Sequence, residues 1–332
     1  MFTVSTTVFP TPGSDLVYAA NEYTPRGAEF VEDGFTLLFT HNLSSCKEMW
    51  EPVMSELCAL CSFEKESEVS IREMWSIEWQ SHGESALLNE GKNTVYNCRV
   101  RDYADAITGF VSNVVRDEHK FVIVGYSAGA IAWGIASLKL STLPFAAVIF
   151  FEPPFVVPPI QENDPRVAIG IHNTKVVLTR KEYWNSILEA RTYLRSRIPW
   201  NSWNQTMFDV VLSHTLRTTK LADGTEIVTT CCSNVMEQPA YGAEDYIAAS
   251  PALNKLCASV PVHIVFGEST DLISNASRAA MCDEQQGRRM KSVQIIPYTG
   301  HLVVHENPLE AAKSIIKILR ETAAALKRKP KL

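Results

Sequence analysis

Short apolar segments that alternate with helical segments limit the fold of this sequence more than any other feature. Phe35–Thr40 (FTLLFT), Phe121–Tyr126 (FVIVGY) and Phe145–Phe151 (FAAVIFF) are largely apolar and rich in residues that favour strands. Similar segments follow at Val260–Gly267 and Val293–Tyr298. Strands that are apolar on both faces are typical of a parallel sheet covered by helices on both sides. The pattern therefore predicts an α/β fold with a mostly parallel central sheet.

Helical segments separate these strands. The segments with apolar residues at helical spacing are Lys47–Phe63, Tyr103–Val115, Ala128–Leu140 and Leu309–Leu326. Val69–Trp79 has the composition of a further strand, and the polar stretch Ser81–Asn93 predicts a loop.

The alternation stops between residues 156 and 246. This region has no strong apolar strand but many aromatic residues, and it predicts a helical lid inserted after the sixth core strand. A lid there would cover the crevice at the carboxyl ends of the strands, where open α/β sheets bind ligands. The predicted division is a core in two parts, residues 1–155 and 247–332, with the lid at 156–246.

Composition narrows the class of protein. With 332 residues, 46% apolar and 20% charged, the chain can bury a sizeable core, and its net charge of −6 gives no reason to expect a nucleic-acid partner. The apolar runs are too short to span a membrane, and residues 1–13 lack the pattern of a secretory signal, so we expect a soluble intracellular protein. The 8 cysteines include one isolated C-x-x-C, Cys58 and Cys61, and predict neither a disulfide framework nor a structural metal.

The motif Gly125-Tyr126-Ser127-Ala128-Gly129 carries the main chemical signal. G-x-S-x-G alone is a weak pattern, but here it follows an apolar strand and opens a helix of small residues, as a nucleophile elbow does. The turn would present the Ser127 hydroxyl, and the Ala128 N–H at the helix N-terminus could bind an oxyanion. The alternative is a serine that only caps the helix.

A serine nucleophile needs a base, and His301 follows the last predicted strand. His305, four residues later, raises the alternative of a metal site, but the sequence lacks the adjacent glutamate and the acidic cluster that would complete one. Two carboxylates could orient His301. Glu152 ends one strand and Asp271 follows another, and both would lie at the same edge of the sheet.

Four ordered motifs together resemble the α/β-hydrolase superfamily over almost the whole chain. They are Thr40-His41 with residues 47–52 (KEMWEP), residues 81–89 (SHGESALLN), the elbow, and residues 300–308 (GHLVVHENP). The chain looks most like a fungal peroxisomal group that includes toxin-biosynthesis hydrolases, the mycophenolic-acid pathway acyl-CoA hydrolase and the yeast peroxisomal lipase.

This resemblance implies further site residues. The second oxyanion N–H would be that of Leu43, or of a neighbour such as Ser45, although His41-Asn42 replaces the usual His-Gly. Glu152 is the predicted acid because members of the group carry theirs after the corresponding strand, and Asp271 stays the alternative. The C-terminal Pro330-Lys331-Leu332 resembles the SKL peroxisomal address and would bind the import receptor, with the cytoplasm as the location otherwise.

The predicted function is therefore that of a serine hydrolase. It would cleave an ester or an acyl-CoA thioester of a bulky, largely apolar acyl group through an acyl-enzyme, with no cofactor. The alternatives are a C–C bond hydrolase, a cyclase or a dehydratase on the same scaffold, and a ligand-binding relative without catalysis, since a fold does not fix a reaction.

Overall fold

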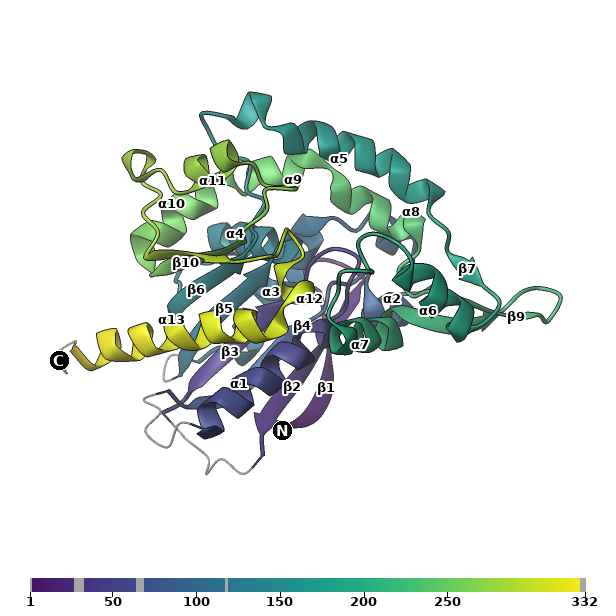
Figure 1. Cartoon of the computed structure of the whole chain (residues 1–332), viewed down its shortest axis with the longest axis horizontal. Coiled ribbons are helices and arrows are strands. Elements are labelled where there is room, and N and C mark those ends of the chain that lie inside the picture. Colours follow the sequence, from purple (N-terminus) through teal and green to yellow (C-terminus); the bar gives the residue numbers. More distant parts are fainter. Residues whose placement is uncertain (1, 27–32, 64–68, 117–118, 329–332) are drawn as a thin grey trace.

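The computed structural model describes residues 2–26, 33–63, 69–116 and 119–328. A central sheet of eight strands has the order β1-β2-β4-β3-β5-β6-β10-β11 (Figure 1). Its strands are β1 (Phe2–Pro10), β2 (Val17–Pro25), β3 (Phe35–Thr40), β4 (Ile71–Ile77), β5 (Lys120–Tyr126), β6 (Phe145–Phe151), β10 (Val262–Gly267) and β11 (Ser292–Ile296). From β4 to β11 all neighbours are parallel, whereas β2 is antiparallel to both β1 and β4. The predicted mostly parallel sheet is thus confirmed.

Helices cover both faces of this sheet, because the strands are apolar on both sides. One face packs against α1 (Glu51–Phe63) and α13 (Pro308–Arg328), with a core that includes Val53 and Ile315. The other packs against α3 (Val100–Val114), α4 (Ala128–Lys139) and α10 (Ser250–Ser259), with a core that includes Phe110 and Leu253. Figure 1 shows α1 and α13 in front of the sheet.

The segment between β6 and β10 holds most of the remaining elements. They are η3 (Gln161–Asn163), α5 (Pro165–Val176), η4 (Val177–Thr179), β7 (Tyr183–Trp184), α6 (Ile187–Arg195), α7 (Gln205–Thr215), β8 (Leu216–Lys220), β9 (Glu226–Thr230), α8 (Asn234–Glu237), η5 (Gln238–Tyr241) and α9 (Ala243–Ala248). In Figure 1, α5, α8 and α9 lie together at the top of the molecule. The boundaries at 156 and 246 stay a prediction, and the second of them falls inside α9.

Short elements complete the chain. They are η1 (Lys47–Trp50), α2 (Gly83–Leu88), η2 (Asn93–Asn97), α11 (Asn275–Met281), η6 (Glu284–Gln286) and α12 (Val303–Glu306). None of the described helices is both long and apolar enough to cross a membrane. The tripeptide Pro330-Lys331-Leu332 lies outside the described residues.

The structure corrects three secondary-structure expectations. The segment 156–246 is not purely helical, because β7, β9 and β8 form a small antiparallel sheet in that order. The predicted loop Ser81–Asn93 contains α2, and residues 2–25, for which no element was predicted, form the hairpin of β1 and β2. The strands of the small sheet and α2 are short, and β1 is mostly exposed, so these elements lack the long apolar pattern on which the prediction relied.

Candidate active site

Ser127 lies on a tight turn between β5 and α4. Its φ of 49° is in the left-handed region, a strained conformation for a residue with a side chain. The turn needs glycine on both sides: a Cβ on Gly125 would lie 2.9 Å from Ala130 Cα, and one on Gly129 would lie 2.7 Å from the Thr40 carbonyl oxygen. The Ser127 hydroxyl makes no capping bond to α4, which argues against a role as a helix cap.

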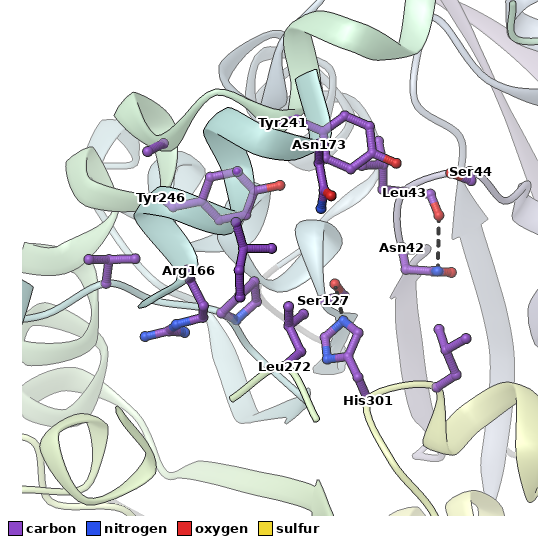
Figure 2. A pocket seen from close by; sticks show the side chains of 16 residues that line it. Asn42, Leu43, Ser44, Ser127, Arg166, Asn173, Tyr241, Tyr246, Leu272 and His301 are labelled. Atoms are coloured by element: carbon purple, nitrogen blue, oxygen red, sulfur yellow. Dashed lines mark hydrogen bonds between the residues drawn. The ribbon is translucent and has the colours of Figure 1, made fainter. Parts of the chain in front are cut away.

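His301 reaches Ser127 from the loop after β11. Its Nε2 lies 2.9 Å from Ser127 Oγ (Figure 2). Both backbone groups of His301 are also held, because its N–H donates to Asp271 Oδ1 at 2.9 Å and its carbonyl accepts from the Tyr126 hydroxyl at 2.9 Å. The ring is therefore aimed at the serine by the loop and not only by its own contacts.

Glu152 contacts the other ring nitrogen of His301. It follows β6, is fully buried, and places Oε2 3.1 Å from His301 Nδ1. Its Oε1 accepts from the Gly267 N–H at 2.7 Å and from Arg278 Nη2 at 3.2 Å. The positive charge of Arg278 and the two donated hydrogen bonds stabilise a carboxylate that would otherwise be costly to bury.

Asp271, the alternative acid, lies on the backbone side of His301. Its Oδ1 and Oδ2 are 2.9 and 3.2 Å from the His301 backbone nitrogen, and the hydrogen bonds of the described residues include none from Asp271 to the His301 ring. This approach requires Gly300, since a Cβ there would lie 2.5 Å from Asp271 Oδ2. Both candidate carboxylates therefore lie beside His301, but Glu152 contacts its ring and Asp271 contacts its backbone N–H.

The two predicted oxyanion donors lie beside Ser127. Ala128 is the first residue of α4, so its N–H has no acceptor within the helix. Leu43 and Ser127 both line the pocket, and the hydrogen bonds of the described residues include none from the Leu43 N–H. The N–H of the next residue, Ser44, is already used, because it donates to His82 Nε2 at 3.2 Å.

Two buried histidines, His41 and His82, fix this loop, and no role was predicted for either. His41 Nδ1 lies 2.7 Å from the Asn42 carbonyl, and its Nε2 accepts from the Trp79 N–H at 3.1 Å. Burial lowers the pKa of His41 and of His82 to about 3, so both rings are neutral at physiological pH. Their places in the Thr40-His41 and Ser81-His82 motifs were the signal that could have singled them out.

An apolar pocket opens above Ser127. It has a volume of about 210 Å³, and Figure 2 shows Tyr241 and Tyr246 over it, with Leu272 and His301 nearer the serine. Arg166 is the charged side chain in the wall, and it is neutralised by Asp164. Such a pocket suits an apolar substrate group held close to the serine.

His305, the partner in the alternative metal site, points elsewhere. Its Nδ1 is 3.3 Å from the Tyr126 hydroxyl and its ring lies against Trp203, with 4.2 Å between the ring centroids. Within the described residues, no group of three or more His, Cys, Asp or Glu side chains is arranged to hold a metal ion.

A family model decides the classification. The model of the Alpha/beta hydrolase family matches residues 37–313. The chain belongs to this family. As in other members of the alpha/beta hydrolase family, its elbow serine follows a core strand of the sheet.

Solved structures of other hydrolases share the fold at low identity. The peroxisomal alpha-beta-hydrolase Lpx1 from Saccharomyces cerevisiae has a TM-score of 0.77 and 17% identity, over 100% of this chain and 91% of that one. The thioesterase domain from the curacin biosynthetic pathway gives 0.63 and 16%, over 96% and 99%. An esterase from M. tuberculosis gives 0.65 and 14%, over 96% and 92%. No curated protein sequence matches the chain.

Proposed function

We propose that this protein is a serine hydrolase that cleaves an ester or an acyl-CoA thioester. The observation that carries the proposal is the chain of contacts from Ser127 Oγ to His301 Nε2 and from His301 Nδ1 to Glu152 Oε2, at 2.9 and 3.1 Å. Esterases and a thioesterase among the solved structures of similar fold are consistent with this chemistry.

The proposed mechanism follows from these contacts. Ser127 Oγ attacks the carbonyl carbon while His301 Nε2 takes its proton, and Glu152 holds the Nδ1–H tautomer and stabilises the charged ring. The N–H groups of Ala128 and Leu43 bind the oxyanion. His301 then gives the proton to the leaving alcohol or thiol, and water activated by the same ring hydrolyses the acyl-enzyme.

The acyl group is proposed to be bulky and largely apolar. Ile169, Tyr241 and Tyr246, all from the segment 156–246, line the pocket together with Leu43 and Leu272 of the core. This supports the proposal that the segment acts as a lid over the serine. Burial of an acyl chain there would contribute about 25 cal/mol for each Å² of apolar surface removed from water.

Replacing Ser127 by alanine tests the serine mechanism. Ser127→Ala should remove turnover of p-nitrophenyl esters and acyl-CoA thioesters down to the residual ~10³–10⁴-fold over water that oxyanion binding supplies. The same change should abolish labelling by a fluorophosphonate probe. Wild-type kcat in this variant would exclude the mechanism.

We also propose that the protein acts in peroxisomal secondary metabolism, as its C-terminal Pro330-Lys331-Leu332 suggests. The name of the yeast structural neighbour describes a peroxisomal protein, which is consistent with this location. Deleting the three residues should leave hydrolysis in vitro unchanged and move an N-terminally tagged protein to the cytosol. A full-length tagged protein found in the cytosol would contradict the proposal.

A further inference from the structure

A second, larger chamber adjoins the apolar pocket. Its volume is about 380 Å³, against about 210 Å³ for the pocket above Ser127, and Ser44 lines both. Glu237 marks the boundary: its Oε1 accepts from the Ser44 hydroxyl at 2.5 Å and from the hydroxyl of Tyr241, which lines the first pocket, at 2.6 Å. The chamber therefore begins beside the loop that carries Leu43.

Basic side chains outnumber acidic ones in the wall of this chamber. Arg180, Lys181 and Arg197 line it, and Glu237 is the one carboxylate among the described lining residues. Arg180 Nη2 lies 2.7 Å from Glu237, so this deep pair is neutral as a unit. Lys181 is paired with the half-exposed Glu189 outside the wall. No described carboxylate lies within ion-pair distance of Arg197.

The two outer cations lie near one aromatic ring. Arg197 Cζ is 4.2 Å from the ring centre of Tyr193, and Lys181 Nζ is 5.0 Å from the same point. Trp184 and Trp200 also line the chamber with aromatic side chains. A ring face stabilises each cation less than an anion would, so an anionic group in the chamber can pair with Arg197 or with Lys181.

We propose that this chamber binds an anionic group of the substrate, a carboxylate or a phosphate, through Arg197 and Lys181. The proposal rests on the proposed hydrolase function, with the scissile carbonyl at Ser127, one side of the substrate in the apolar pocket and the anionic side in the chamber. The anion could be a carboxylate at the end of the acyl group or a phosphate on the leaving group. Both have the same chemistry toward a guanidinium.

Matched substrates separate these two sources. One arm compares the p-nitrophenyl ester of a fatty acid with that of a dicarboxylic acid of equal length, and the other compares thioesters of pantetheine and phosphopantetheine. In at least one arm the wild-type enzyme should have the higher kcat/KM for the anionic member. That preference should fall about tenfold in Arg197→Gln and in Lys181→Gln, as expected for one lost charged hydrogen bond.

Lys220→Gln is the matched control. Lys220 is an exposed lysine paired with Glu226 on the small sheet, outside the chamber wall, so its loss should leave the preference unchanged. The proposal is overturned if the wild type shows no preference in either arm, or if both chamber variants keep the wild-type preference.

A binding measurement distinguishes failure of this proposal from failure of the hydrolase function. Ser127→Ala protein is titrated with inorganic pyrophosphate, with nonanedioate and with uncharged 1,9-nonanediol, and the fluorescence of its tryptophans is followed. At least one anion should bind more tightly than the diol, and added salt should weaken it. Anion binding without hydrolysis of any ester would reject the proposed hydrolase function but support the anion site in the chamber. Ester hydrolysis without anion preference or anion binding would support the hydrolase function and reject the anion site.

Discussion

At the scale of single residues, the two carboxylates around His301 should behave differently. Glu152→Gln removes the charge that faces His301 Nδ1 and should lower kcat about 10⁴-fold, as loss of the triad carboxylate does in serine proteases. Asp271→Asn keeps an oxygen for the His301 N–H and should change kcat by less than about tenfold. Steady-state kinetics on one p-nitrophenyl ester checks both, and the reverse order of effects would make Asp271 the acid.

The pattern of strands predicted that Glu152 and Asp271 lie near His301, but it did not show which carboxylate contacts the ring. Glu152 and Asp271 follow neighbouring parallel strands, so both were expected at the edge of the sheet that carries His301. Which of them faces the ring depends on the loop after β11, where Tyr298 has a φ of 58° and Gly300 allows Asp271 to reach the backbone. Side-chain direction at such turns is set by tertiary contacts that a pattern of strands does not contain.

At the scale of elements, the start of α2 packs against Glu78, a buried carboxylate that also binds the first residue of η1. Gly83 has a φ of 48°, and a Cβ there would lie 2.0 Å from Glu78 Oε1. Glu78 is buried and accepts from the N–H groups of Ser85 and Lys47, at 2.8 and 3.3 Å. Gly83→Ala should therefore displace Glu78 and lower the free energy of unfolding by about 2–4 kcal/mol, from backbone strain together with overpacking.

Gly224→Ala is the control for backbone strain alone. Gly224 has a φ of 86° in the turn between β8 and β9, and a Cβ there would meet nothing within 4 Å. This change should cost about 1–2 kcal/mol. Urea denaturation measures both variants, and equal losses would show that Glu78 does not resist the added methyl group.

The strands differ in how well their sequence patterns predicted them. The core strands were predicted because each is a continuous apolar run buried on both faces. In contrast, β8 (LRTTK) has one buried residue, Leu216, followed by half-buried and exposed positions, and β1 is exposed along most of its length. Their pairing depends on neighbours distant in sequence, so an apolar count could not reveal them.

At the scale of the whole molecule, buried histidines should make folding sensitive to acid. Burial lowers the pKa of His41, His82 and His305 to about 3 from an ordinary value of 6.5. Below pH 6.5 the unfolded chain therefore binds protons that the folded chain does not. The free energy of unfolding should fall as the pH falls, by about 1 kcal/mol per pH unit for each histidine.

Glu78 opposes this trend without cancelling it. Burial raises its pKa to about 7 from 4.5, so between these values the folded chain binds one proton more than the unfolded chain. Glu22, Glu51 and Asp102, whose pKa values burial also raises, oppose the trend as well, whereas His263, whose pKa burial lowers to about 4, adds to it. Because Glu78 offsets one of the four buried histidines, stability should still fall between pH 6.5 and 4.5. Urea titrations across this range measure the slope. His305→Gln should reduce the slope, whereas the same change at the exposed His172 should leave it unchanged. A slope that is flat in the wild type would mean that the buried rings take up protons without unfolding the protein.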